Sequence, residues 1–298
     1  MKYWKLKNDT NIINKCSFSK RFLFKNWVTV FMNRIRLPML SQVSLIVNEV
    51  AGIIDQMGNA FFKFLYIFLY AGRDFLRSDL FVKIRKYSKG HVLDIGGRDF
   101  FIRAKNKGIK FSKWTTIEIS SEEYYPVDDS RFLFEVGDGC NLKYKNETFD
   151  TILNIHVLEH VFEPIKMVKE AARVLKKGGY AIFLIPSSAP LHLAPQNYYN
   201  FTKFWIEEVM ARSGLKIIEL KPLGGLWQTI TARLFYFFLK SARVTGMSTK
   251  DNRRNFFFYL LFPLTCVYAL LSIPVTLFFT LGDLTEDPND HLVVVKKI

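Results

Sequence analysis

The stretch HVLDIGGRDF, residues 91–100, contains the pattern that decides the fold. It reads as a short apolar strand that carries an acid at Asp94 and then turns through Gly96 and Gly97. In a parallel sheet, the carboxyl end of a strand and the next helix form the ligand crevice, and glycine lets a ligand approach the backbone. A dinucleotide site would have further glycines where this chain has Arg98 and Phe100, so a pyrophosphate cofactor is disfavoured.

From residue 90 onward, short apolar runs alternate with amphipathic segments, which predicts a βαβ series. Between the fourth and fifth strands, Ile165, Val168, Ala172 and Leu175 recur at helical spacing, and Gly178 predicts the end of that helix. The predicted strands are 91–95, 114–119, 132–136, 149–155, 180–185, 215–221 and 291–296.

Acids follow three consecutive predicted strands. Asp94, Glu118 and Asp138 each fall at the carboxyl end of a strand, so a parallel sheet would bring them to one edge. Taken alone, each is best read as a solvated loop residue, but the series favours a cationic nucleoside without phosphate.

The blocks VLDIGG (92–97), IEIS (117–120), GDGCNLKYKNETFDTILNIHVLEHV (137–161) and EAARVLKKGGYAIFLIP (170–186) resemble a class I S-adenosylmethionine-dependent methyltransferase of the type 11 kind. The resemblance implies an α/β, Rossmann-like seven-stranded sheet of order 3-2-1-4-5-7-6 with helices on both faces. Its antiparallel last strand would be 291–296. The resemblance also implies a cofactor site made by Asp94, Gly96, Gly97, Glu118, Asp138, Gly139 and Asn154.

A second block, PLHLAPQNYYNFTKFWIEEVMARSGLKIIEL (190–220), is similar to a pattern in methyltransferases of bacterial surface-glycan clusters. Asn197 and Asn200 replace the acid and the arginine of that pattern. The resemblance implies substrate contacts from His192, Tyr198, Tyr199 and Trp205, with Trp205 stacking on a sugar. The alternative is that these aromatic residues only pack a helix onto the sheet.

Methyl transfer to a hydroxyl needs a group that removes the proton, and His156 at the end of the fourth strand is our candidate, with His160 beside it. The motif HVLEHV places His156, Glu159 and His160 at i, i+3, i+4 spacing. With His192, they resemble the metal ligands of small-RNA 3′-end methyltransferases, although His156 replaces a glutamate. Because L-E-H is widespread without a metal in type 11 sequences, we expect no divalent metal.

The formal net charge of +15 indicates an anionic partner, either nucleic acid or the cytoplasmic face of a membrane. Residues 1–36 carry nine basic residues and one acid, Asp9, with aromatic residues between them, which is an interfacial composition. The apolar run 60–72 fits a packed helix and a membrane-surface helix equally. The three cysteines lack a CxxC spacing, so neither a disulfide framework nor a cysteine zinc site is expected.

The run FFFYLLFPLTCVYALLSIPVTLFFTLGD, residues 256–283, is apolar enough to enter a bilayer. Strands on both sides of it must join one sheet, so we expect a return to the same side, with Pro263 and Pro274 dividing the run into arms too short to cross. We therefore predict a monotopic or re-entrant protein on the cytoplasmic face, single-pass only if the last strand leaves the sheet. A packed helical subdomain or a dimer interface is the alternative. We expect four parts in the chain: a basic, amphipathic helical region at 1–88, the methyltransferase core at 89–224, a hydrophobic membrane-associating insertion at 225–288 and the last strand of the core at 289–298.

These features predict a methyltransferase that O-methylates a sugar or a lipid-linked glycan at an anionic membrane surface. A quinone or lipid methyltransferase, an RNA methyltransferase and a non-catalytic protein of the same fold are the alternatives. Nucleic acid is disfavoured as a partner, because the basic residues lie beside apolar runs and form no discrete domain with stacking platforms.

Overall fold

The computed structural model describes residues 78–124, 126–193, 195–241 and 255–298. Seven strands form one sheet in the order β3-β2-β1-β4-β5-β7-β6. Strands β1 to β5 run parallel to one another, and β7 is antiparallel to both of its neighbours, β5 and β6. The predicted α/β sheet, its strand order and its antiparallel last strand are confirmed. The strands are β1 (His91–Ile95), β2 (Lys113–Glu118), β3 (Phe132–Val136), β4 (Phe149–Ile155), β5 (Leu175–Pro186), β6 (Leu215–Leu223) and β7 (Asp290–Lys297).

Helices cover both faces of the sheet because the central strands alternate apolar side chains between two cores. In β1, Leu93 joins the core beneath α6 (Pro164–Val174) and α7 (Lys203–Arg212). Val92 joins the opposite core beneath α4 (Ser78–Tyr87) and α5 (Phe100–Asn106). Short 3-10 turns, η1 (Ser121–Glu123), η2 (Leu158–His160) and η3 (Thr280–Gly282), complete the connections. Since α4 buries Leu80 and Ile84 against the sheet, residues assigned by sequence to the N-terminal region contribute to the core.

The helix after β4 ends earlier than predicted. Its last residue is Val174, and Leu175 already pairs with Phe149 as the first residue of β5. Gly178 has a φ of +73° but lies inside β5, so it does not end the helix. Ile165 is half exposed, and the buried face is carried by Met167, Val168, Ala171, Ala172 and Val174.

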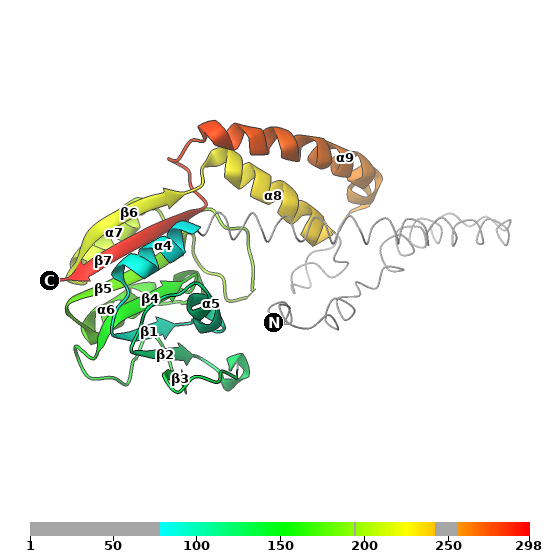
Figure 1. Cartoon of the computed structure of the whole chain (residues 1–298). Coiled ribbons are helices and arrows are strands. Elements are labelled where there is room, and N and C mark those ends of the chain that lie inside the picture. Colours follow the sequence, from blue (N-terminus) through cyan, green and yellow to red (C-terminus); the bar gives the residue numbers. More distant parts are fainter. Residues whose placement is uncertain (1–77, 125, 194, 242–254) are drawn as a thin grey trace, which may run out of the picture.

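Helices α8 (Leu226–Ser241) and α9 (Phe256–Phe279) leave the sheet between β6 and β7 and pack against each other (Figure 1). The Thr231 hydroxyl donates to the Thr276 hydroxyl at 2.7 Å, and the rings of Trp227 and Phe279 pack against each other at a tilt of 50°. At the base, the Leu226 amide donates to the Leu284 carbonyl, so both ends of the hairpin meet beside the sheet. The predicted return to the sheet is confirmed.

The prediction that Pro263 and Pro274 divide the apolar run is wrong, because both lie inside the continuous helix α9. An apolar helix of 24 residues is about 36 Å long, enough to cross roughly 30 Å of hydrocarbon. Within Phe256–Gly282, an 18-residue window has a mean hydropathy of 2.1, and 11% of that window is buried. It is the one helix in the described part of the chain that is long and apolar enough to span a membrane.

The hairpin joins the sheet at the edge where the predicted crevice lies. The last residue of β6, Leu223, and the last residue of β5, Pro186, both pair with Asp290 at the start of β7. Since β5 is parallel to β4 and β1, these residues lie at the carboxyl edge of the sheet. The insertion therefore borders the ligand edge.

Candidate active site

The glycine turn after β1 is built around a buried acid. Asp94 is fully buried, and neither of its carboxylate oxygens has a hydrogen-bond partner among the described residues. A Cβ on Gly97 would lie 1.9 Å from Asp94 Oδ2, and one on Gly96 would lie 2.6 Å from Val157 Cγ2. Gly96 also has a φ of +72°. Both glycines are therefore required by close packing at this turn.

The turn departs from a fully glycine-rich loop at Arg98, yet Arg98 keeps a glycine-like backbone with a φ of +48°. Its amide donates to Glu118 Oε1 at 2.7 Å, and its guanidinium pairs with Glu123 at 2.7 Å. The loop after β1 therefore holds the carboxylate of Glu118, at the end of β2, by a backbone hydrogen bond. Neither the Arg98–Glu123 pair nor this amide contact could be read from strand and helix periodicity.

Burial perturbs the acids at this edge. Burial raises the pKa of Asp94 well above its usual range, and the negative charge of Glu118 adds to that rise. Burial also raises the pKa of Glu118 to about 7, and Glu123 adds to it, although the Arg98 amide opposes the shift. A cation placed between these carboxylates would favour their ionised forms, so the site suits a positively charged ligand.

The remaining predicted cofactor residues are Asp138, Gly139 and Asn154. Asp138 follows β3, where its carboxylate accepts the Cys140 amide at 2.8 Å. Gly139 has no room for a side chain, because a Cβ would lie 2.5 Å from Met167 Cε. Asn154 is fully buried on β4 and donates to the Met167 sulfur, so it lies on the α6 face of the sheet, opposite Asp94.

His156 lies at the turn after β4 with a φ of +57°, where its amide donates to the Leu184 carbonyl. Its Nδ1 is 3.6 Å from Glu159 Oε1, and its Nε2 is 3.4 Å from Asp290 Oδ1. The sequence pointed to His156 but not to Asp290, because only the β5–β7 register brings the start of the last strand to this edge. Two carboxylates therefore border the candidate base.

The predicted residues His160 and His192 lie together. Their rings are 4.7 Å apart, and each Nε2 is 3.8 Å from Glu159 Oε1. Burial lowers the pKa of His160. Glu159 and His160 belong to η2, and α6 starts only at Pro164, so the L-E-H motif does not begin an α-helix here.

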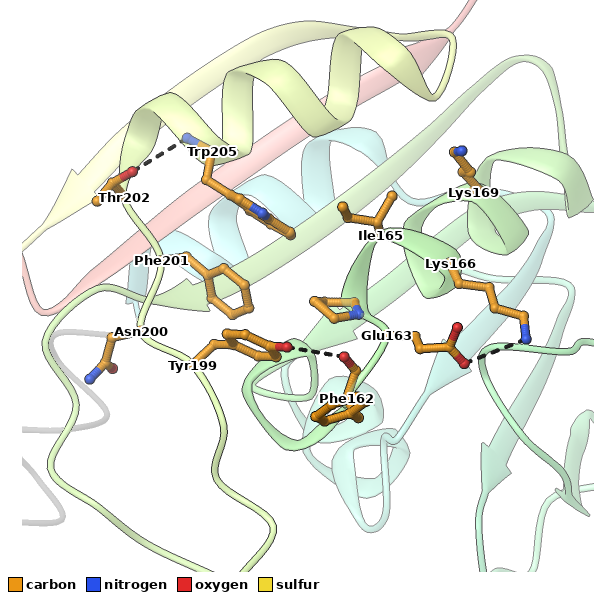
Figure 2. A pocket seen from close by; sticks show the side chains of 11 residues that line it. Phe162, Glu163, Ile165, Lys166, Lys169, Tyr199, Asn200, Phe201, Thr202 and Trp205 are labelled. Carbon is orange, nitrogen blue, oxygen red and sulfur yellow. Dashed lines mark hydrogen bonds and ion pairs between the residues drawn. The ribbon is translucent and has the colours of Figure 1, made fainter.

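An aromatic groove of about 730 Å³ adjoins this cluster at the start of α6 and α7. Figure 2 shows Tyr199 and Trp205, two of the four predicted substrate residues, among its lining side chains. The Tyr199 hydroxyl donates to the Phe162 carbonyl, and Trp205 packs against Phe201 at a ring distance of 4.3 Å. Tyr198 stacks edge-on against Phe162 beside these residues. The groove is within the size range of small-ligand sites.

Comparison with known proteins finds similarity to methyltransferases. A family model described as "Methyltransferase domain" matches residues 100–183. An uncharacterized protein of Methanocaldococcus jannaschii is 36% identical over 151 residues, which cover 50% of this chain and 70% of that one. The phosphatidylethanolamine N-methyltransferase of Cereibacter sphaeroides is 31% identical over 102 residues, 30% of this chain and 50% of that one. The ubiquinone biosynthesis O-methyltransferase of Parvibaculum lavamentivorans is 30% identical over 103 residues, 27% and 41% of the two chains.

Among solved structures, the Haemonchus contortus phosphoethanolamine N-methyltransferase 2 in complex with S-adenosyl-L-methionine is similar, with a TM-score of 0.44 and 16% identity. It covers 74% of this chain and 52% of that one. The chain spans half or less of the length of the two named curated enzymes above.

The fold and the family match define a class I methyltransferase. The chain belongs to the methyltransferase-domain family, for which S-adenosylmethionine is the expected cofactor. The orphaned Asp94 carboxylate, the side-chain-free turn at Gly96 and Gly97 and the buried Glu118 fit that cofactor.

Proposed function

We propose that this protein O-methylates a sugar of a lipid-linked or membrane-proximal glycan. The observation that carries the proposal is the attachment of the apolar hairpin to the acceptor side of the site. From α8, Arg233 donates to the Ser188 carbonyl and Tyr236 donates to the Leu191 carbonyl, both at 2.7 Å. These bonds hold the segment that leads to His192 and to the aromatic groove.

Membrane association is part of this proposal. Along α9, large apolar side chains are exposed on the described surface, among them Phe257, Leu264, Tyr268, Leu271 and Phe278. An exposed apolar face of this length favours a bilayer as its partner. Arg233, which we also expect to lie near the lipid headgroups, ties α8 to the acceptor segment. Arg243, Lys250, Arg253, Arg254, the side chain of Lys240 and the basic residues of 1–36 lie outside the described residues.

In this proposal, different side chains bind the cofactor, accept the proton and bind the acceptor. Asp94, Glu118 and the glycine turn would hold S-adenosylmethionine, which supplies a methyl group on a positively charged sulfonium. His156, bordered by Glu159 and Asp290, is placed to accept the proton of the acceptor hydroxyl. Tyr199 and Trp205 offer ring faces on which a sugar can stack. Positioning the acceptor and excluding water then supply most of the rate.

A lipid or quinone acceptor is the second candidate. The exposed apolar α9 favours it, as do two relatives whose names refer to phosphatidylethanolamine and to ubiquinone biosynthesis. The aromatic groove, which also carries Lys166 and Lys169, favours the sugar over an apolar ring.

The test is transfer of a radiolabelled methyl group from S-adenosylmethionine into membranes of the cells that make the protein. We expect the label in the lipid-extractable glycan and, after acid hydrolysis, in an O-methyl sugar. His156→Ala should lower turnover by about 10²–10⁴ at unchanged cofactor affinity, and His91→Gln, on the far end of β1, is the control. Label confined to RNA or to the quinone fraction would contradict the glycan proposal.

A further inference from the structure

Three potential metal ligands meet beside the candidate base. Glu159, His160 and His192 each offer one ligand atom, and these atoms all lie within 4.8 Å of one another. Glu159 and His160 come from η2, whereas His192 comes from the segment between β5 and α7. The fold therefore brings His192 to two ligands that lie 32 and 33 residues before it in the sequence.

Backbone carbonyls fix both imidazoles in one tautomer. His160 Nδ1 contacts the Gln196 carbonyl, and His192 Nδ1 is 2.9 Å from the Pro190 carbonyl. Because a carbonyl only accepts hydrogen bonds, each Nδ1 must carry the proton. Each Nε2 then has a free lone pair, which is the arrangement that metal-bound histidines usually show.

The spacing of the three side chains fits an ion better than a direct hydrogen-bond network. Each Nε2 is 3.8 Å from Glu159 Oε1, which is longer than a hydrogen bond. Metal bonds of about 2.0–2.2 Å place neighbouring ligand atoms of a tetrahedral site about 3.4 Å apart. Each imidazole would therefore move toward Glu159 by a few tenths of an ångström, and the two imidazoles, whose ligand atoms lie within 4.8 Å, would also close on the ion. Glu159 is fully buried, and an ion would also stabilise its charge there.

Although the sequence alone led us to expect no divalent metal, we propose from this geometry that Glu159, His160 and His192 bind one divalent transition-metal ion. Zn²⁺ is the best match to two imidazoles and one carboxylate. Three protein ligands leave a coordination position open. His156 Nδ1 is 3.6 Å from Glu159 Oε1, so the ion would lie beside the candidate base. Resting on the proposed function, the open position would hold and polarise the acceptor oxygen.

The test is metal uptake by the full chain in detergent after dialysis against EDTA, measured by calorimetric titration with ZnCl₂ and by elemental analysis. We expect one zinc per chain. His160→Gln and His192→Gln should each weaken binding by about tenfold or more, and His91→Gln should not, since His91 lies outside the cluster. Calorimetric binding of S-adenosylmethionine checks that each variant is folded.

Equal zinc affinity of the wild type and the His160→Gln/His192→Gln double variant, with cofactor binding intact, would overturn the proposal. Should the double variant fail to fold, Glu159→Gln takes its place, with the same loss expected. The experiments distinguish failure of the metal-site proposal from failure of the glycan-acceptor proposal. Methyl transfer into glycan that persists in EDTA, without zinc uptake, overturns only the metal site, whereas zinc uptake without glycan methylation overturns only the acceptor.

Discussion

At the scale of single residues, the closest packing in the cofactor site is between Gly97 and Asp94. Gly97→Ala should displace the Asp94 carboxylate, because the new Cβ would lie 1.9 Å from Asp94 Oδ2. Gly97 does not have a left-handed backbone, so the effect would be steric only. We expect S-adenosylmethionine binding to fall below detection by calorimetry. Gly282→Ala, where a Cβ meets nothing within 4 Å, should bind as the wild type does, and a tight-binding Gly97→Ala would contradict this account.

Glu118 predicts a pH-dependent cofactor affinity. Its pKa is about 7 in the protein without ligand, since burial favours the protonated acid. A cationic cofactor favours the carboxylate, so binding releases a proton, and affinity should rise by about tenfold from pH 6 to pH 8. Calorimetric titrations across this range measure the effect. In Glu118→Gln, only the cofactor and the other ionisable groups can make the affinity depend on pH. If the affinity of the wild type rises with pH no more steeply than that of Glu118→Gln, ionisation of Glu118 does not control cofactor binding.

The sequence located the candidate residues that end strands and missed those that depend on register. Asp94, Glu118 and His156 could be identified because the carboxyl edge of a parallel sheet collects such residues. Asp290 could not, because its approach to His156 requires the alignment of β7 on β5. Asn154 lies on the α6 face by strand alternation, and its place beside the cofactor stays a prediction.

At the scale of elements, hydrophobic patterning predicted where strands run better than where helices end. β1, β3 and β4 have the predicted bounds, since each is a short apolar run between polar turns. β5 starts five residues before the predicted strand, because Leu175 pairs with Phe149 across a bulge. Periodicity over 165–175 could not separate a helix from the strand that continues it. The predicted breaks at Pro263 and Pro274 were wrong for a related reason. Proline lowers helix propensity, but it does not exclude a long apolar helix such as α9.

The last strand closes the sheet and should be indispensable for folding. In β7, Val294 is fully buried and faces Ile182 of β5. Val294→Asp would bury an unpaired charge at the centre of the sheet, which costs several kcal/mol. We expect loss of cooperative thermal unfolding, followed by circular dichroism. Ile298→Asp, on the exposed residue after β7, should unfold as the wild type does, and native-like melting of Val294→Asp would show that β7 is dispensable.

At the scale of the whole molecule, the hairpin and the catalytic edge form one unit, because α8 and α9 start and end at the carboxyl edge of the sheet (Figure 1). The exposed face of α9 should hold the protein on vesicles containing anionic lipid. Each large apolar side chain removed from a bilayer costs about 1.5–3 kcal/mol, so replacing Leu264, Tyr268, Leu271 and Phe278 by serine should abolish co-flotation.

A matched set of exposed apolar residues elsewhere on the molecule provides the control for this experiment. Serine at Val82, Leu133, Phe204 and Ile298 should leave flotation unchanged. Loss of vesicle binding in both sets, or in neither, would mean that α9 does not dock on the membrane and would favour a packed or dimeric role for the hairpin.

The central claim is that the crevice at the carboxyl ends of β1 and β2 binds S-adenosylmethionine. The most direct measurement is calorimetric titration of the full chain with the cofactor, for the wild type, Asp94→Ala and Glu118→Ala. The account predicts one site per chain, no measurable binding in Asp94→Ala and a loss of about 1.5–3 kcal/mol in Glu118→Ala, with all three proteins showing the same secondary structure. Absence of binding to the wild type, or equal affinity in all three proteins, would contradict it.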